Sequence, residues 1–466
     1  MSDANGDGRW ALPEGWVWTT LGEACDINMG QSPPSSTYNT EGIGLPFYQG
    51  KAEFGALYPT PVKWCSSPQK ISEVGDILLS VRAPVGATNV NKETSCIGRG
   101  LAAIKPPIQM SNLYFLYYLR YSEQNLIDRA TGTTFQAVSG KVVRNHPIPL
   151  APAPDQHRIV AEIEKQFTRL DAAVAALRRA KANLARYKAA VLQAAVEGRL
   201  VAQTSEVSET SEVLLARVLA ERRAQWEAAN PRKQYVEPKG PDVAGLPELP
   251  VGWVWASMEQ LADIVSGVAK GRKFGNRQPL TLPYLRVANV QQGYLDLSEI
   301  KTIEALSEEL EAYRLRKNDL LLTEGGDWDK LGRSAIWYGQ IEDCIHQNHI
   351  FRARPFLSDL SSKWLMFATN SEHGRGYFAK SSKQTTNLAS INLTQLRAFP
   401  VPIPPLNEQV RLIEQVESLI SLVDAAEHSI GANLARADRL RQGVLGKAFR
   451  GELVANGETS EVSEDL

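Results

Sequence analysis

Two stretches of the chain repeat each other: LPEGWVWTTLGEACDINMG at residues 12–30 and LPVGWVWASMEQLADIVSG at residues 249–267. The Trp-Val-Trp alternation in both is typical of a β-strand, in which successive side chains point to opposite faces. Their separation is far longer than a solenoid module, so the repeat predicts two copies of one whole domain. The identical pairs are Leu12 and Leu249, Pro13 and Pro250, Gly15 and Gly252, Trp16 and Trp253, Val17 and Val254, Trp18 and Trp255, Asp26 and Asp263, Ile27 and Ile264, and Gly30 and Gly267.

A second set of matching stretches closes each copy. IPLAPAPDQHRIVAEIE (148–164) matches VPIPPLNEQVRLIEQVE (401–417), and AVLQAAVEGRLV (190–201) matches GVLGKAFRGELV (443–454). Between the matched ends the copies diverge and contain short β-like runs, such as GDILLSV (75–81), broken by Gly and Pro turns. The matched ends therefore predict structural elements that both domains share, called the frame below. The divergent middles predict parts that differ between two mixed α/β domains.

Long helices are predicted at the end of each copy. No Pro or Gly occurs from Asp155 to Val196, and apolar residues recur every seven positions there and after Asn407. Sustained heptads are typical of a coiled coil, so each helix needs a partner, and the other copy offers one. Asp155 and Asn407 are the expected N-caps, and the rod is about 60 Å long at about 1.5 Å per residue. The predicted helix-pairing residues are Ile163, Leu170, Leu177, Leu184, Val191, Val416, Val423, Ile430, Ala437 and Val444.

The alternative is that each helix folds back onto its own domain, but a rod of that length could not bury a heptad repeat against a compact domain along its full extent. We therefore predict an α+β fold in which two mixed α/β domains are each followed by a long helix. The two helices are expected to pair as an antiparallel coiled coil with pseudo-twofold symmetry. The predicted boundaries are 1–154 for the first domain, 155–201 for the central helix, 202–244 for a linker with a short helix, 245–406 for the second domain, 407–454 for the C-terminal helix and 455–466 for an acidic disordered tail.

Composition favours a cytoplasmic binding protein. With 43% hydrophobic and 22% charged residues the chain is typical of soluble proteins, and no run of about 18 apolar residues predicts a membrane span. The four cysteines show no CxxC spacing, which fits a reducing compartment. The net charge of −1 includes two acid-rich segments, 204–213 and 455–466. Without them the remainder is mildly basic, which permits nucleic-acid binding.

Motifs of catalysis are absent from the sequence. It contains no phosphate-binding loop, no G-x-G-x-x-G that opens a helix, no H-E-x-x-H and no G-x-S-x-G. His346 and His349 have metal-like spacing without an evident third ligand, so a structural role is favoured over a metal site. Asp327 and Asp329 are better explained as a solvated turn than as an acidic pair. The chain is therefore predicted to bind a partner and to catalyse nothing.

This plan of two variable domains, each followed by a long helix, resembles the specificity subunits of type I restriction–modification enzymes over nearly the whole chain. LPFYQGKAEFG (45–55), GDILLSVRAPVG (75–86) and CIGRGLAAI (96–104) resemble one class of target recognition domain. LLTEGGDWDKLGR (321–333) and CIHQNHIFRAR (344–354) resemble another.

The resemblance implies a non-catalytic subunit that binds double-stranded DNA, two adenine-N6 DNA methyltransferase (modification) subunits and restriction/translocase subunits, and no membrane. S-adenosylmethionine, ATP and Mg are expected on those partner subunits, with no cofactor on this chain. Two unlike domains could not read a palindrome, so the expected site is asymmetric and bipartite. Its halves would lie about one helical turn, roughly 34 Å, apart on one face of the duplex. The alternatives are a stand-alone bipartite DNA-binding regulator, which would bind tightly without partners, and a scaffold built on the coiled coil.

DNA-reading residues are sought among Arg, Lys, Asn and Gln on loops and strand ends, because these groups recognise base edges and phosphates. The alternative for each lone Arg is a surface salt bridge, whereas the dense cluster in VAKGRKFGNRQ (268–278) favours DNA. The repeated tryptophans are expected to belong to the frame. The candidates in the first domain are Gln31, Ser35, Ser36, Gln49, Lys51, Arg82, Arg99 and Lys141. Those in the second are Lys270, Arg272, Lys273, Arg277, Arg286, Asn289, Trp328, Lys330, Arg333, Lys380, Lys383 and Gln384.

The linker between the copies contains TSEVSE (204–209), which returns at 459–464. As short central repeats are thought to do in this family, the number of such repeats could tune the distance between the two domains. A passive acidic linker is the equal alternative.

Overall fold

The computed structural model describes residues 10–132, 136–202, 209–326, 330–384 and 389–454. Only the backbone of Lys383 and Gln384 is described. The predicted acidic tail, Trp328 and most of the TSEVSE segment lie outside the described residues.

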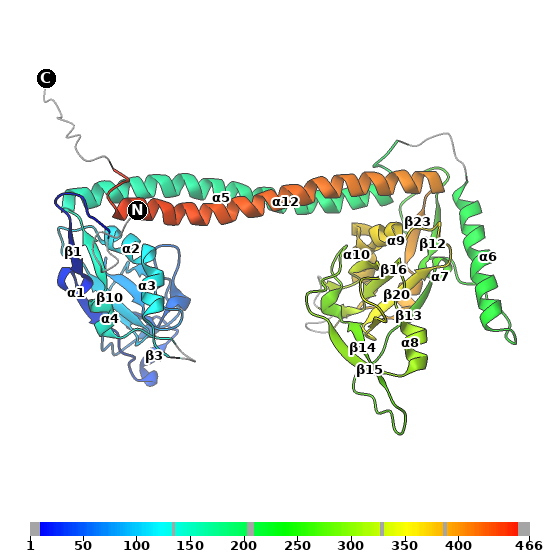
Figure 1. The fold of residues 1–466 in the computed structure, drawn as a ribbon, viewed down its shortest axis with the longest axis horizontal. Coiled ribbons are helices and arrows are strands. Elements are labelled where there is room, and N and C mark those ends of the chain that lie inside the picture. Colours follow the sequence, from blue (N-terminus) through cyan, green and yellow to red (C-terminus); the bar gives the residue numbers. More distant parts are fainter. Residues whose placement is uncertain (1–9, 133–135, 203–208, 327–329, 385–388, 455–466) are drawn as a thin grey trace, which may run out of the picture. The chain divides into compact units, whose positions relative to one another are not determined.

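Contacts divide the chain into two compact units. Unit 1 comprises Met1–Arg178 and Ile430–Leu466, and unit 2 comprises Arg179–Ser429. Each unit therefore contains one variable domain together with parts of both long helices, α5 (Ala153–Val196) and α12 (Leu406–Phe449). Both units contain sheets and helices (Figure 1), which confirms the mixed α and β class.

Unit 1 is built on a four-stranded sheet of order β2-β10-β7-β8. Helix α2 packs on β7 and β8 of this sheet, and residues 114–119 of the helix, aromatic or leucine, are buried. A small sheet of order β3-β5-β4-β9-β6 adjoins it, and β1 pairs with β11. The strands are β1 Val17–Thr20, β2 Asp26–Met29, β3 Tyr38–Asn39, β4 Leu45–Tyr48, β5 Trp64–Cys65, β6 Ile71–Ser72, β7 Ile77–Ser80, β8 Thr88–Val90, β9 Ser95–Ile97, β10 Leu101–Lys105 and β11 Pro147–Leu150. The helices are α1 Leu21–Ala24, α2 Asn112–Tyr121, α3 Glu123–Asp128 and α4 Gly140–Arg144, with 3-10 turns η1 Ser35–Thr37 and η2 Lys51–Glu53.

Unit 2 repeats this topology. Its main sheet has the order β13-β20-β16-β18, β12 pairs with β23, and the parallel pair β14–β19 corresponds to β4–β9. The strands are β12 Val254–Ser257, β13 Ala262–Ser266, β14 Leu280–Leu285, β15 Lys301–Ala305, β16 Asp319–Thr323, β17 Gly325–Gly326, β18 Ser334–Trp337, β19 Ile345–His346, β20 Ile350–Pro355, β21 Lys383–Gln384, β22 Ala389–Ser390 and β23 Pro400–Ile403. The helices are α6 Ser211–Ala229, α7 Met258–Leu261, α8 Ser307–Tyr313, α9 Ser362–Asn370, α10 Glu372–Ser381 and α11 Leu393–Arg397, with 3-10 turn η3 Val287–Asn289.

The repeated prolines hold equivalent positions in the two cores. Trp18 pairs with Pro149 in the two-stranded sheet of unit 1, and Trp255 pairs with Pro402 in that of unit 2. The carbonyl of Pro149 accepts a hydrogen bond from the Tyr114 hydroxyl at 2.6 Å. The carbonyl of Pro402 accepts one from the indole of Trp364, which replaces Tyr114 in unit 2, at 2.7 Å. The frame thus keeps an acceptor while the aromatic donor changes.

Both long helices end two residues before the glycine of the repeated G-x-L-V stretch. Gly198 and Gly451 have φ values of +69° and +74°, a conformation that favours glycine after a helix. At both ends two N–H groups bond back to helix carbonyls, as in a Schellman motif. Gly198 bonds to Ala195 and Gly451 to Ala448, and the residue after each glycine bonds to the carbonyl one position earlier, that of Ala194 or Lys447. The helices therefore end at Val196 and Phe449, before the predicted ends at 201 and 454. They also begin at Ala153 and Leu406, so the predicted caps lie inside the first turn.

Contacts between α5 and α12 occur inside each unit. In unit 2 the Nζ of Lys188 lies 2.6 Å from Asp424 and 2.7 Å from Glu427, and Arg411 of α12 donates to the carbonyl of Ala202, beyond the end of α5, at 2.9 Å. In unit 1 Arg441 forms an ion pair with Asp171. Of the predicted helix-pairing residues, Ile163, Val191, Val416, Val423 and Ala437 are buried, and Leu170, Leu177, Leu184, Ile430 and Val444 are half-buried.

The end of each helix completes the core of a unit. In unit 1 the fully buried ring of Phe449 lies 5.2 Å from that of Tyr114 and 5.1 Å from that of Tyr118. In unit 2 Val191 and Ala195 of α5 belong to the core that contains Trp253. Each domain core is therefore closed by the helix that follows the other domain in sequence.

We predict that Phe449→Ala lowers the free energy of unfolding of unit 1 by about 3–5 kcal/mol, since it leaves a cavity among aromatic rings. The matched control is Leu440→Ala on the same helix, because Leu440 is 47% exposed. Urea unfolding of the two variants checks this, and equal destabilisation would contradict the closure of this core by α12.

Candidate nucleic-acid interface

Four chain segments meet at one edge of the unit 1 sheets. They follow β2 (Gly30–Ser32), β4 (Gln49–Lys51) and β7 (Val81–Ala83), or join β9 to β10 (Gly98–Gly100). Because β2, β7 and the parallel pair β4–β9 all end there, the topology brings their C-terminal residues together. These segments surround a cavity of about 280 Å³. It is lined by Ser32, Gln49, Gly50, Lys51, Ser80, Arg82, Ala83, Arg99 and Gly100.

Close backbone contacts hold this edge together. Gly100 accepts a hydrogen bond from the Val81 N–H at 2.9 Å, and Gly98 donates to the Tyr48 carbonyl at 2.8 Å. A Cβ on Gly100 would lie 2.2 Å from the Gln49 carbonyl oxygen, and one on Gly30 would lie 2.2 Å from that of Gly98. Glycine is therefore required at both positions, and the Gly-Arg-Gly sequence leaves only the Arg99 side chain to project from this turn.

The side chains around the cavity are cationic. Lys51, Arg82 and Arg99 are exposed, and none of them forms an ion pair with a carboxylate in the described part of the chain. The nearby Glu53 carboxylate instead accepts the Gly50 N–H at 3.2 Å. Four of the residues predicted to read DNA in the first domain therefore share one cavity, and Ser32 is a further lining residue that the sequence did not single out.

The other four candidates of the first domain lie outside this cavity. Gln31, Ser35 and Ser36 are exposed on the loop that leaves β2, and Lys141 is exposed on α4. Their roles stay predictions.

Unit 2 has the same backbone edge with different side chains. Gly267, the repeat partner of Gly30, again contacts a carbonyl, because its Cβ would lie 2.0 Å from the His346 oxygen. Arg286 follows β14 and forms an ion pair with Glu299 at 3.0 Å. Glu324 follows β16 and accepts from the exposed His349, with 2.5 Å between Oε2 and Nδ1. The edge therefore has paired charges where unit 1 has unpaired cations.

His346 lies inside unit 2 beneath this edge. It is fully buried, and its Nδ1 lies 2.9 Å from the Ile350 carbonyl. Burial lowers its pKa to about 4, so the ring is neutral at neutral pH. In the described part of the chain no group of three or more His, Cys, Asp or Glu side chains could hold a metal ion.

The basic cluster at 268–278 is largely paired. Arg272 forms an ion pair with Glu309, and Arg277 lies 2.9 Å from Glu308. Both carboxylates belong to the first turn of α8. Lys270 lies over the Tyr284 ring at 5.5 Å, whereas Lys273 is exposed. These contacts favour the salt-bridge alternative for the two arginines. The ion pairs could not be predicted from the sequence, because the glutamates lie more than thirty residues downstream of the arginines.

The remaining candidates of the second domain are dispersed. Asn289 is 3% exposed, and its amide donates to the carbonyls of Asp296 and Glu299, so it holds a turn. Arg333 donates to Gln291 at 2.9 Å. Lys380 is exposed on α10, Lys330 is half-buried, and Lys383 and Gln384 form β21. Glu324, Asn348 and His349 also lie at this edge but were not among the candidates from the sequence. Their positions after β16 or between β19 and β20 could have indicated that they belong there.

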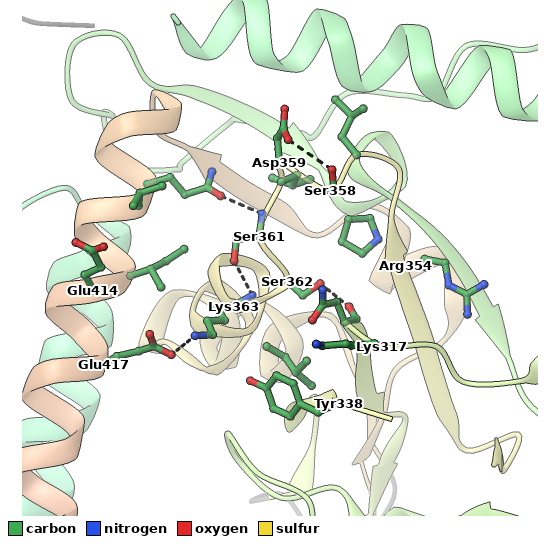
Figure 2. Close-up of a pocket in the computed structure, with 18 residues that line it drawn as sticks. Lys317, Tyr338, Arg354, Ser358, Asp359, Ser361, Ser362, Lys363, Glu414 and Glu417 are labelled. Carbon is green, nitrogen blue, oxygen red and sulfur yellow. Dashed lines mark hydrogen bonds and ion pairs between the residues drawn. The ribbon is translucent and has the colours of Figure 1, made fainter. Parts of the chain in front are cut away.

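A separate cavity of about 650 Å³ lies at the opposite end of β16 and β20. Figure 2 shows it between α12 and the start of α9, with Lys363 bonded to Glu417 and Ser358 to Asp359. The buried Gln409 accepts the Ser361 N–H at 3.1 Å, as its repeat partner Gln156 accepts that of Ser111 in unit 1. These repeated glutamines therefore serve the frame, apart from the strand-end edge.

Two copies of one fold with different residues at the same edge define a protein with two binding domains. The family model described as type I restriction modification DNA specificity domain matches residues 13–178 and 250–434. The chain therefore belongs to the family of type I restriction–modification DNA specificity subunits. Its role in such a complex is sequence recognition in DNA, without catalysis.

Relatives with this description cover different shares of the chain. A putative MjaX specificity subunit from Methanocaldococcus jannaschii is 39% identical over 41% of this chain, and the match spans only 45% of that relative. The EcoBI specificity subunit of Escherichia coli is 22% identical over 98% of this chain and 90% of its own length. The HsdS subunit structure from Thermoanaerobacter tengcongensis has a TM-score of 0.48 and 19% identity, and covers 96% of this chain and 99% of that one.

Within the described residues, helices that combine the length and apolarity needed to cross a membrane are not found.

We predict that Gly100→Ala distorts the edge of unit 1 and lowers its stability by about 1–3 kcal/mol, because the new methyl group overlaps the Gln49 carbonyl. Gly50→Ala is the matched control, since Gly50 is extended at a φ of −179° and a Cβ there meets open space. Thermal unfolding compares the two, and an unchanged Tm for Gly100→Ala would show that the edge can relax.

Proposed function

We propose that each unit reads one half of an asymmetric, bipartite double-stranded DNA site through its strand-end edge. The observation that carries this proposal is the shared backbone edge with different side chains at equivalent positions. A common backbone presents both edges to DNA in the same way, while different donors and acceptors select different bases. The unpaired cations of unit 1 supply attraction to phosphate.

In this proposal α5 and α12 pair as an antiparallel coiled coil with pseudo-twofold symmetry. The order of their contacts supports this: Lys188 of α5 meets Asp424, whereas Ala202, which follows the end of α5, meets Arg411, which lies earlier in α12. Each helix has 44 residues, or about 66 Å at about 1.5 Å per residue. Such a rod is long enough to set a separation of about one turn of DNA, roughly 34 Å.

The helices also offer a surface for the partner subunits. Leu422 is 67% exposed on α12, and Tyr187 is 47% exposed on α5. We assign these exposed apolar side chains to the docking of two DNA methyltransferase subunits, which in turn work with restriction/translocase subunits. S-adenosylmethionine, ATP and Mg belong to those partners in this scheme, and this chain supplies only recognition. The expected setting is the cytoplasm.

The direct test compares methylated adenines in DNA from cells with and without the gene, by single-molecule sequencing. We predict that loss of the gene removes methylation from one motif with two unlike halves and a fixed spacer. A continuous or palindromic motif would contradict the two-reader proposal.

A second test separates helix pairing from partner docking. Val423 is 5% exposed, so we predict that Val423→Asp buries a charge and lowers the unfolding free energy by at least about 2 kcal/mol. Leu422→Asp, at the neighbouring exposed position, should leave the fold intact and weaken assembly with the methyltransferase. Circular dichroism and co-purification measure the two effects, and normal assembly by Leu422→Asp would reject the docking surface.

A further inference from the structure

We infer that Arg82 and Arg99 are specificity-determining residues and that the half-site read by unit 1 contains guanines that they contact. This inference rests on the proposed function and adds the class of base that one reader selects. It follows from three features: fixed backbones, free guanidinium groups, and the absence of arginine at the equivalent positions of unit 2.

The backbones of both arginines are anchored on the sheet edge. The Arg82 carbonyl accepts from the Ser80 hydroxyl at 3.0 Å, and the flanking residues bond to Gly100 and Gln136. The Arg99 N–H donates to the Ser32 hydroxyl at 3.3 Å, and the preceding Gly98 is held by Tyr48. The backbone positions of both arginines are therefore fixed before DNA binds, which limits the conformational entropy lost on binding.

Their guanidinium groups are available to a ligand. Both side chains are exposed at one cavity, and neither pairs with a carboxylate of the described chain. In the same unit Arg120 is bonded to the Ala56 carbonyl and Arg441 is paired with Asp171. The donors of Arg82 and Arg99 are therefore available to a ligand, unlike those of Arg120 and Arg441, and both arginines lie at the same cavity.

Guanine is the base that matches such donors. Its major-groove edge presents two acceptors, N7 and O6, and the planar fork of a guanidinium bonds to both at once. Gln49 lines the same cavity and offers one donor and one acceptor, the pattern that fits adenine. Lys51 has no fork, so we assign it to a phosphate.

Strand register locates the equivalent positions in unit 2. Tyr48 pairs with Ile97, and Leu285 pairs with His346, so Arg99 corresponds to Asn348, two residues further on. Ser80 faces the start of β10 as Thr323 faces that of β20, so Arg82 corresponds to Gly325. Gln49 corresponds to Arg286, which is already paired with Glu299. The guanine contacts therefore belong to the half-site of unit 1 alone.

The experiment uses the full chain co-expressed with its methyltransferase partner, and maps the methylated motif for Arg82→Ala, Arg99→Ala and Arg316→Ala. Arg316 is the matched control, because it is exposed at the opposite end of the unit 2 sheet. We expect each of the first two changes to reduce the preference for guanine at one position of one half by roughly 5- to 150-fold. The other half, the spacer and the Arg316→Ala motif stay as in the wild type.

Binding measurements with modified DNA keep the test decisive if an alanine variant fails to assemble. Replacing a contacted guanine by 7-deazaguanine removes the N7 acceptor. It should weaken wild-type binding and have no further effect on Arg82→Met or Arg99→Met, which keep a long side chain but have no hydrogen-bond donor. Lys51→Ala should weaken binding to all duplexes alike and leave base preference unchanged.

Two results would overturn the inference. One is an unchanged motif in both arginine variants with methylation retained, and the other is a changed preference at a base other than guanine. Either would leave a bipartite wild-type motif, and with it the two-reader function, intact. Absence of a bipartite motif in the wild type would instead defeat the proposed function itself.

Discussion

The close contact between a helix-ending glycine and the opening proline of the other copy is the constraint on which both units depend. In unit 2 a Cβ on Gly198 would lie 2.4 Å from the Pro250 ring, and in unit 1 a Cβ on Gly451 would lie 2.1 Å from that of Pro13. Both glycines have a positive φ, so the residue type is required by conformation and by space together. Each copy of the repeat therefore supplies one half of a joint whose other half lies in the second copy. Residues at the matched ends of the repeat cannot change independently, because a substitution at the glycine or at the proline must still fit its contact partner in the other copy.

The same logic explains why the middles are free to differ. The frame needs glycine where the strand-end turns touch, as at Gly30 and Gly267, and needs a carbonyl acceptor where Pro149 and Pro402 stand. It places no demand on the side chains that project from those turns. Arg99 and Asn348 occupy equivalent positions with unlike chemistry, at no cost to the sheet behind them. A protein built in this way can acquire a new target by changing the projecting residues while its cores stay closed.

The sequence predicted what depends on local pattern and on repetition. Trp-Val-Trp alternation located β1 and β12, and unbroken heptads located α5 and α12, because period and composition alone set these elements. Helix ends were misplaced by a few residues, since the Schellman geometry at Gly198 depends on where the chain turns. The ion pair of Arg272 could not be predicted from the sequence, because only the folded chain brings Glu309 next to it. Conversely, Gln49, Lys51, Arg82 and Arg99 were chosen from loop position and charge, and the topology that places them around one cavity could not be derived from spacing.

Pairing of charges also bears on how a chain with a net charge of −1 approaches DNA. Attraction to phosphate depends on local charge within about a Debye length, roughly 8–10 Å, so an acidic segment elsewhere does not cancel the cations at the edge of unit 1. In unit 2 the Arg277–Glu308 pair is 64% and 63% exposed, and a surface pair of this kind contributes only about 0–1 kcal/mol. The pair therefore holds the Arg277 guanidinium beside Glu308 while adding little to the stability of the unit. Unit 1 thus has unpaired cations at its strand-end edge, whereas Arg286 at the equivalent edge of unit 2 is paired with Glu299.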